Sequence, residues 1–399
     1  MLGIPMKRPY LCGKGAILAT TLIVAAFVAG CSSGGGSDTN QPDPYQSQSG
    51  PVNCGSNPVL THAMSLLKTA QQSTIPWTGP TSGPKTQPNK TIVYIAQDMS
   101  NGGVLGVSKG VQNAAAAIGW KVTVIDGRGT VAGRVAAIGQ AVALHADGII
   151  LGSVDSEEEK AAINQAAAAG VKIVGWHSAP AAGPVPGTPI FTNITTNATD
   201  VAAVSAADAL QITNCKAGAV IFWQSGDTIG ISKAETMRSI VQACTTCKLL
   251  DYVNTPLADT ATRMEGETNS LRQQFGTKWT IGLGINDLYF DFASPALTSA
   301  GVSPSSPPQF ISAGDGSIAA FNRIRAGYYQ MATVAEPLNE AGWQAVDELN
   351  RAFAGAGPSG YVSPVHIVTK ANINTNGGPQ NVYDPNNDYK THYEQIWKG

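Results

Sequence analysis

The stretch TIVYIAQDMSNGGVLGVSKGVQNAAAAIGWKVTVI, residues 91–125, decides the fold class. It opens with the largely apolar run 91–96, which is short enough for a strand buried on both faces. Apolar residues at helical spacing then predict a helix: Val104, Val107, Val111, Ala115 and Ile118. A second short apolar run at 121–125 predicts another strand. A strand, a helix and a strand in this order are typical of a parallel β-α-β unit.

The same alternation continues along the chain in two series. In the first, strands are predicted at 147–151 and 171–175, and helices at 131–144 and 157–169. A Pro- and Gly-rich break at 180–189 follows. In the second series, strands are predicted at 219–223, 249–253, 280–284 and 309–313, with helices near 231–243, 262–275 and 287–300. This pattern predicts an α/β fold with two parallel sheets, each covered by helices on both faces.

The first thirty residues have the features of an export signal. A basic n-region (Lys7, Arg8 and Lys14) precedes the apolar stretch 16–28, which is too short to span a membrane comfortably. The sequence VAGC at 28–31 resembles a bacterial lipobox, in which the chain is cut before Cys31 and that thiol is lipidated. An uncleaved signal anchor is the alternative. We therefore expect a periplasmic or cell-envelope protein, anchored to a membrane by lipid.

Composition excludes several classes of function. Charged residues make up 13% of the chain, the net charge is −2, and no basic stripe is present, so nucleic acid is not an expected partner. In an oxidising compartment, Cys54, Cys215, Cys244 and Cys247 could form up to two disulfides in any of three pairings. The CxxC at 244–247 lacks the further ligands of a zinc site, so no metal is expected.

Catalytic motifs are missing from the sequence. The glycines at 103–110 fit neither GxGxxG nor the phosphate-loop pattern, and no GxSxG or HExxH occurs. The histidines are scattered, at His62, His145, His177, His366 and His392. We therefore expect no enzyme and no cofactor.

Polar residues gather where the predicted strands end. In open parallel sheets, ligands bind beyond the carboxyl ends of the strands. The residues at these ends are Gln97, Asp98, Asn101, Asp126, Arg128, Ser153, Asp155, Trp176 and His177 in the first series, and Gln224, Asp227, Asn286, Asp287 and Asp315 in the second. They predict a cleft that closes on a small molecule. For Asp126, Asp155 and Asp227, a helix cap or solvated turn is an equally good interpretation.

Short segments stand in an order that identifies a family: DMSN at 98–101 followed by Gly110 and AAAAIG at 114–119, ADGII at 146–150, AAGVKIV at 168–174, NITTN at 193–197, GIND at 284–287 followed by AG at 300–301, SAGDG at 312–316, and IRAG at 324–327 followed by ATVAEP at 332–337 and Gly342. With them, residues 90–370 resemble the type I periplasmic solute-binding proteins, the ribose- and galactose-binding group related to the lac repressor core.

The resemblance implies two Rossmann-like lobes, joined by three crossover segments, that bind one ligand in the cleft and deliver it to an ABC permease. It implies an N-terminal lobe of 90–190 plus 337–362 and a C-terminal lobe of 191–336 plus 363–372. Signal peptide 1–30, tether 31–58, N-terminal extension 59–89 and C-terminal tail 373–399 flank them, and the tail's aromatic residues are expected to dock onto the body. Hinges are expected near 179–191, 306–310 and 336–337.

Carried over by position, Asn101, Asn286, Asp315 and Glu336 should face the ligand. The chain also departs from the sugar binders of this family. Gly103 and Val104 stand where aromatic residues usually follow the first-helix Asn, and Trp176-His177 replaces the usual Asp-Arg pair.

The arginine that the family usually carries in the helix after the first strand of the C-terminal lobe is also missing. Lys233, Glu235 and Arg238 lie in this helix, but none is cleanly in register with that arginine. Trp176 could supply a stacking or cation–π surface, or could pack between the lobes. With Asp98, Asp315 and Glu336 in one cleft, the ligand is expected to be a sugar, a polyol or an amine-bearing solute. The predicted function is the substrate-binding lipoprotein of a sugar-type ABC importer. The alternative is a module that reports a bound ligand to a membrane kinase or chemoreceptor.

Overall fold

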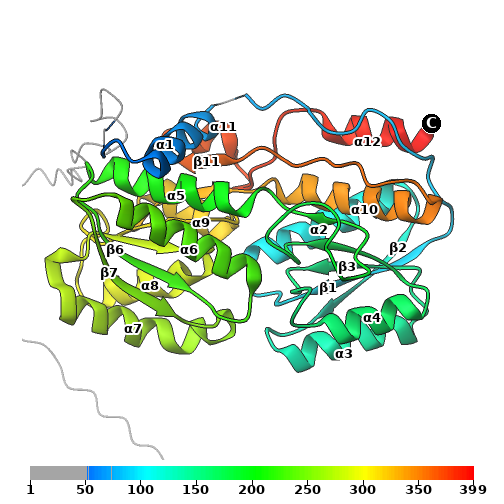
Figure 1. Cartoon of the computed structure of the whole chain (residues 1–399), viewed down its shortest axis with the longest axis horizontal. Helices are drawn as coiled ribbons and strands as arrows, with labels where there is room; N and C mark the ends of the chain where they lie inside the picture. Colours follow the sequence, from blue (N-terminus) through cyan, green and yellow to red (C-terminus); the bar gives the residue numbers. More distant parts are fainter. Residues whose placement is uncertain (1–51, 53, 73) are drawn as a thin grey trace, which may run out of the picture. The chain divides into compact units, whose positions relative to one another are not determined.

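The computed structural model describes residue 52 and residues 54–72 and 74–399 (Figure 1). The predicted signal peptide, Cys31 and most of the predicted tether lie outside these residues. Within the described part of the chain, no helix is long and apolar enough to cross a membrane.

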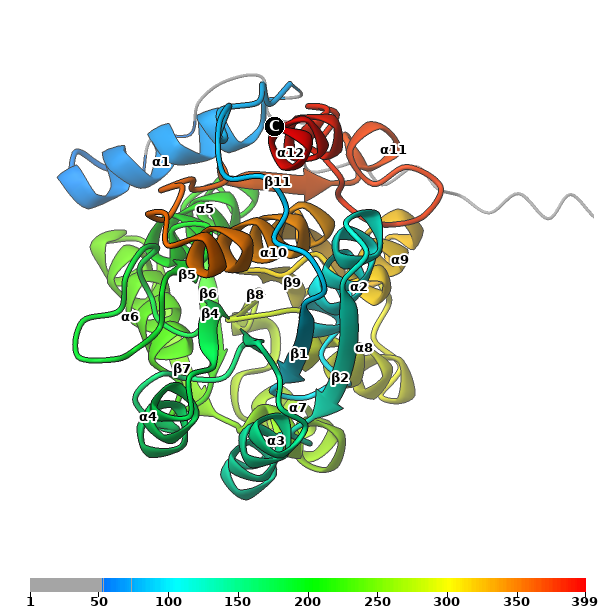
Figure 2. The same ribbon diagram turned by 90° about the vertical axis from the view of Figure 1, so that its right-hand side faces the viewer.

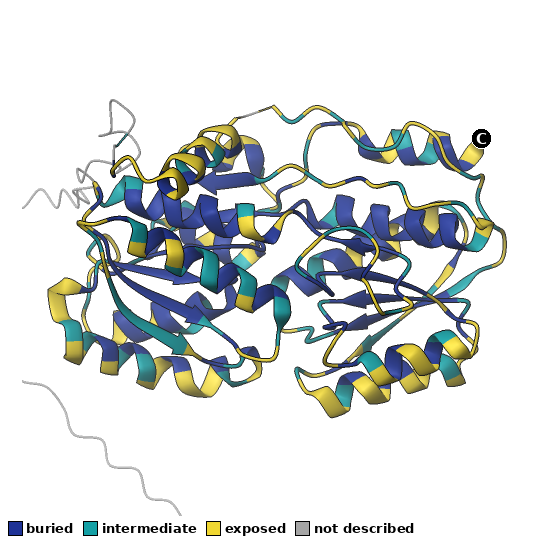
Figure 3. Cartoon of the chain, in the orientation of Figure 1, coloured by how far each residue is buried: buried dark blue, intermediate teal, exposed yellow. Residues whose placement is uncertain are grey.

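The first lobe is built on a five-stranded parallel sheet with the order β2-β1-β3-β4-β5. Its strands are β1 (Thr91–Ala96), β2 (Lys121–Asp126), β3 (Gly148–Gly152), β4 (Lys172–Trp176) and β5 (Asn193–Ile194). Helices α2 (Gly102–Ala117) and α10 (Leu338–Ala354) pack on one face, and α3 (Val131–Ala143) and α4 (Lys160–Ala168) pack on the other. Because both faces are covered, β1 is buried almost from end to end, as its unbroken apolar run predicted (Figure 3).

The second lobe is built on a six-stranded sheet with the order β11-β10-β9-β8-β6-β7. Its parallel strands are β6 (Gly218–Trp223), β7 (Lys248–Asn254), β8 (Ile281–Gly284), β9 (Gln309–Ser312) and β10 (Gln330–Ala335), and β11 (His366–Thr369) runs antiparallel to β10. The helices of this lobe are α5 (Ala198–Ile212), α6 (Thr228–Ala243), α7 (Thr260–Phe275), α8 (Leu288–Ser299) and α9 (Ile318–Ala326). The predicted α/β fold with two sheets is confirmed.

Three segments carry the chain between the lobes. It leaves the first sheet after Ile194, returns at 336–337 between β10 and α10, and crosses again between α10 and β11. The expected hinge at 336–337 therefore lies on a crossover, whereas the other two expected hinges are wrong. Residues 179–191 connect β4 and β5 of one sheet, and residues 306–310 lead from α8 into β9 within the second lobe.

Both ends of the described chain pack onto the lobes. Near the N-terminal end, α1 (Pro58–Ala70) lies along α5 of the second lobe. At the C-terminal end, α11 (Ile373–Asn376) precedes α12 (Tyr389–Lys398), which lies beside α10 (Figure 2). The predicted docking of the tail is confirmed, because Tyr393, Ile396 and Trp397 are buried and Trp397 Nε1 donates to Asp347 Oδ1 at 2.9 Å.

Two disulfides resolve the pairing that the sequence left open. Cys54 is bonded to Cys215, and Cys244 is bonded to Cys247, each with Cα atoms 5.3 Å apart. The first bond ties the segment before α1 to the residues that follow α5, across a sequence separation of 161. The second closes the short turn between α6 and β7.

Candidate functional site

Four ionisable side chains meet between the lobes. His177 directly follows β4, Asp315 follows β9, Glu336 follows β10, and Lys233 lies on α6. His177 Nε2 lies 2.8 Å from Glu336 Oε2, and Lys233 Nζ lies 3.8 Å from Glu336 Oε1 and 3.9 Å from Asp315 Oδ1. All four residues are buried. We call them the central cluster.

His177 reaches the cluster because of an unusual backbone conformation. Its φ is 54°, in the left-handed region that residues other than glycine adopt only when their surroundings impose it. Its ring stacks on that of Trp176, with centroids 3.9 Å apart and an interplanar angle of 12°. Trp176 is itself fully buried in the apolar core beside α10. The structure therefore places Trp176 as the support of His177, with the imidazole ring lying against one indole face.

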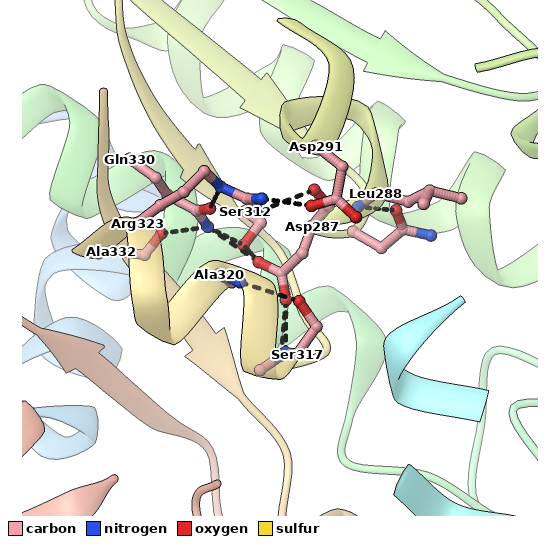
Figure 4. Close-up of polar contacts among 11 residues, drawn as sticks. Asp287, Leu288, Asp291, Ser312, Ser317, Ala320, Arg323, Gln330 and Ala332 are labelled. Atoms are coloured by element: carbon pink, nitrogen blue, oxygen red, sulfur yellow. Dashed lines mark hydrogen bonds and ion pairs between the residues drawn. The ribbon is translucent and has the colours of Figure 1, made fainter. Parts of the chain in front are cut away.

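A hydrogen-bonded network around Asp287 (Figure 4) holds the loop that follows Asp315. Asp287 Oδ2 accepts from the backbone N atoms of Gly316, at 2.9 Å, and Ser317, at 2.8 Å, and this fixes the loop just after Asp315. Asp287 Oδ1 accepts from Gln330 Nε2 at 2.9 Å. Asp287, which the strand-end pattern also singled out, thus holds the loop rather than joining the central cluster.

The first turn of α2 contacts Asp315 from the opposite lobe. A Cβ atom built on Gly103 would lie 2.2 Å from Asp315 Oδ2. Only glycine leaves room for the carboxylate at this position, where the sequence comparison with sugar binders expected an aromatic residue. The absence of a side chain at Gly103 therefore allows the lobes to approach closely here.

Lys233 is the member of the cluster that sequence reasoning missed. In the sequence, Lys233 is not cleanly in register with the helix arginine of the family. In the structure, its ammonium group nevertheless lies between the two carboxylates. A lysine stem is long and flexible, so its head group can reach a site that the helical position alone does not indicate. The signal that could have found it was the presence of two predicted cleft carboxylates with no assigned cation.

The pKa values of the two carboxyl groups are shifted in opposite directions. Burial, opposed by the charges of Lys233 and His177, raises the pKa of Asp315 to about 6. Burial also acts to raise the pKa of Glu336, but the nearby His177 and Lys233 outweigh it and hold that pKa below its ordinary value. Glu336 is thus the carboxylate that stays ionised. Its Oε1 atom is buried with no hydrogen-bond partner within the described residues, so it can accept a hydrogen bond from a bound molecule.

A metal ion would compete with Lys233 at this site. One ligand atom each from His177, Asp315 and Glu336 lies within 4.8 Å of the others, a set that could reach a divalent cation. However, the Lys233 ammonium group already supplies positive charge beside both carboxylates. The cluster is better suited to a polar organic solute, since it offers hydrogen-bond donors (Lys233 and His177) and acceptors (Asp315 and Glu336).

The remaining predicted site residues lie at helix starts and a strand end. The Oδ1 atom of Asn101 caps α2 by accepting from Gly103 N at 2.9 Å, and Asn286 Oδ1 accepts from Leu288 N at 3.0 Å. Asp98 is half-buried, and its Oδ1 accepts from Ser100 N at 2.8 Å. Asn101 lies close to the cluster because α2 begins against Asp315, but these hydrogen bonds of all three side chains are local.

A separate cavity of about 620 Å³ lies at the side of the lobe junction. Residues of α2, the first turn of α9 and the tail at 380–384 line it, and Lys109 is its lining cation. No member of the central cluster lines this cavity. It is therefore distinct from the candidate site.

Comparison with known proteins identifies the two-lobed fold. Residues 92–357 match the family model described as a periplasmic binding protein domain. Among solved structures, one described as a sugar ABC transporter from Yersinia enterocolitica has a TM-score of 0.66 and 17% identity, and the match covers 80% of this chain and 99% of that chain.

Two further structures have the same fold. A solute-binding protein from Agrobacterium vitis bound with α-D-tagatopyranose has a TM-score of 0.64 and 15% identity, covering 74% of this chain and 99% of that chain. A glucose-galactose binding protein from Geobacillus stearothermophilus has a TM-score of 0.62 and 16% identity, covering 72% and 99%. A search of curated protein sequences gives no match.

Proposed function

Because this chain belongs to the periplasmic binding proteins, a family of two-lobed solute binders rather than enzymes, we propose that it is the substrate-binding component of a sugar-type ABC importer. In this proposal it captures a small polar solute between its lobes and delivers it to a membrane permease. The solved structures with the same fold include proteins whose descriptions name sugars or sugar transport, which supports a sugar or polyol as the solute.

The central cluster is the observation that carries the proposal. It is buried between the lobes, it is made of donors and acceptors, and Glu336 Oε1 has no hydrogen-bond partner within the described residues. The Lys233 ammonium group lies 3.8 Å from this oxygen, which is beyond hydrogen-bond length, so a hydroxyl group of a solute can supply the hydrogen bond that the oxygen lacks. Lys233 also balances the carboxylates, so a neutral polyhydroxyl compound suits the cluster better than an amine.

A thermal-shift screen of residues 52–399 tests the proposal. Sugars, polyols, amines and amino acids would be added singly to the protein. A solute at about a hundred times its dissociation constant stabilises the folded state by roughly 2.7 kcal/mol, which is a shift of several degrees for a chain of this size. A stabilising sugar or polyol supports the proposal. A folded, ligand-free protein that responds to no compound in the panel contradicts it.

Variants then locate the site. Asp315→Ala and Lys233→Ala should each abolish the shift given by the active solute, because each removes a group of the cluster. Lys109→Ala is the matched control, since Lys109 lines the separate cavity. Loss of binding in Lys109→Ala, with binding retained in the cluster variants, would move the site to that cavity.

The proposed attachment to the membrane is through lipid on Cys31. The support is the lipobox-like sequence 28–31 and the Ser- and Gly-rich residues that follow it. Cells expressing the full chain would be labelled with radioactive palmitate. Cys31→Ala should lose the label, and Cys12→Ala, which changes a cysteine of the predicted signal peptide, should keep it. A wild-type protein without label contradicts the proposal.

A further inference from the structure

A carboxylate of the first lobe caps a helix of the second. Asp155 lies in the loop after β3, and α6 begins at Thr228. Oδ2 of Asp155 accepts from the backbone N atom of Thr228 at 2.9 Å and from its Oγ1 atom at 2.6 Å. Asp155 is only 5% exposed. The sequence allowed Asp155 to be a helix cap, and the structure shows that the capped helix belongs to the other lobe.

Asp227, the residue before α6, serves other donors of its own lobe. Its Oδ2 accepts from Gln224 Nε2 at 2.9 Å, and its carboxylate also accepts from the backbone N atom of Gly230 in the first turn of α6. The free N–H group at the start of a helix favours a negative charge, and hydrogen bonds to a carboxylate are stronger than those to neutral acceptors. Asp155 therefore supplies from the first lobe an interaction that the second lobe does not itself provide for Thr228.

The loop that carries Asp155 is held in place by its own lobe. Oδ1 of Asp155 accepts from the backbone N atoms of Glu157, at 2.9 Å, and Glu158, at 3.1 Å. The buried Arg134 of α3 donates from Nε to Glu159 and from Nη2 to Glu158, both at 2.6 Å. These contacts lie entirely within the first lobe, so they persist when the lobes separate. The carboxylate is thus oriented before α6 approaches it.

We infer that Asp155 is an interlobe latch, meaning a side chain that stabilises the closed arrangement of the lobes through Thr228 without contacting the solute. The inference rests on the proposed function, in which the lobes open to admit a solute. Opening moves α6 away from the loop after β3 and breaks both contacts. Because α6 also carries Lys233, Asp155 is a positioning residue for the central cluster: the contact with α6 brings Lys233 and Asp315 of the second lobe toward His177 of the first.

Asp155→Asn removes the latch and keeps the loop. Asparagine has one acceptor oxygen and one NH₂ group where aspartate has two acceptors. If the oxygen continues to serve Glu157 and Glu158, the NH₂ group faces the Thr228 donors and cannot accept from them. Thr228→Val is a milder change, because it deletes the Oγ1 donor and leaves the backbone N–H group. Asn57→Ala is the control, since Asn57 is exposed and its Oδ1 caps α1, which packs on the second lobe, by accepting from Val59 N at 2.9 Å.

The experiment measures the distance between lobes in ligand-free protein. Spin labels on unnatural amino acids would replace Ala161 of α4 and Ala261 of α7, two exposed positions in different lobes, so that both native disulfides remain (Figure 1). Pulsed EPR then gives the distribution of distances. We expect Asp155→Asn to lower the ratio of closed to open protein by about tenfold or more, Thr228→Val to lower it less, and Asn57→Ala to leave it unchanged.

Two results would overturn the inference. One is a wild-type distance distribution in both Asp155→Asn and Thr228→Val. The other is an equal shift in Asn57→Ala, which would show that any lost helix cap loosens the lobes. If Asp155→Asn does not fold, Thr228→Val decides, because it leaves the loop's carboxylate in place. No solute is added, so the outcome is independent of whether the thermal-shift screen finds one.

Discussion

His177 Nε2 lies 2.8 Å from Oε2 of Glu336, and this contact joins the end of a first-lobe strand to a segment between the lobes. Glu336 is on the crossover that leads from β10 to α10, so it lies near the axis about which the lobes would move. Asp315 and Lys233, in contrast, belong wholly to the second lobe. The central cluster therefore has a fixed pair at the hinge and a pair that moves with one lobe.

Replacing Lys233 should lower the free energy of unfolding, because two buried carboxylates lose their cationic partner. Lys233→Met leaves Asp315 and Glu336 without their ammonium partner. Removing one partner of a buried ion pair destabilises by about 3–5 kcal/mol, because an uncompensated charge remains. Urea unfolding of residues 52–399 would measure this loss. The double variant Lys233→Met/Asp315→Asn should recover part of it.

Lys172→Met provides the control for that series, since Lys172 is an exposed lysine at the start of β4. It should change the free energy of unfolding by less than about 0.5 kcal/mol. If Lys233→Met is as mild as Lys172→Met, the ammonium group does not neutralise the cluster.

Trp176 and His177 can be separated by their effects on binding. His177→Ala deletes the ring that contacts Glu336, and should weaken binding of the solute found by screening by about tenfold or more. Trp176→Phe keeps an aromatic face beneath His177, and should weaken binding by less than about threefold. Isothermal titration calorimetry measures both. A tenfold loss in Trp176→Phe, with His177→Ala unaffected, would mean that the indole itself contacts the solute.

The strands could be predicted because a strand covered on both faces leaves a short, unbroken apolar run, as β1 does. The long-range contacts could not be predicted in this way. Lys233 meets Asp315 and Glu336 only after the second lobe has folded, and Asp155 meets Thr228 only when the two lobes come together. No local pattern records such pairs, which are 73 residues apart in the case of Asp155 and Thr228.

Buried charges on α10 were equally hidden from the sequence. In an amphipathic helix the charged residues ordinarily face water. In the structure, Glu340, Asp347 and Glu348 are buried, because remote segments cover them. Asn387 Nδ2 donates to Glu340 Oε2 at 3.0 Å, and Trp397 Nε1 donates to Asp347 Oδ1 at 2.9 Å. The C-terminal tail thus covers charged residues of α10 that would otherwise face water.

The two disulfides should differ in their contribution to stability. Cys54–Cys215 closes a long loop of the unfolded chain, whereas Cys244–Cys247 closes a very short one. Loop-closure entropy grows with loop length, so the long-range bond should contribute more. We expect the double Ser variant of the first pair to lose about 2–4 kcal/mol, and that of the second pair to lose less. Denaturant unfolding of both variants tests the order, and the reverse order would contradict it.

Glu348 predicts a pH dependence that a single substitution should remove. Burial, opposed by hydrogen bonding from Ser359, raises the pKa of Glu348 from 4.5 to about 7. The folded protein therefore favours the protonated acid. Its contribution to stability is full below the unfolded pKa and is lost as the pH rises through about 7.

Glu348→Gln keeps an acceptor for Ser359 and cannot ionise. The difference in free energy of unfolding between this variant and the wild type should therefore grow from about pH 4 to about pH 8, by up to about 3 kcal/mol, and the difference in melting temperature should grow with it. Differential scanning calorimetry at both pH values measures it. In the control Glu394→Gln, the changed residue lies on the surface of α12 with a side chain 43% exposed, so the difference should stay nearly constant. A constant difference for Glu348→Gln as well would mean that this carboxyl group titrates in the folded protein as it does in water.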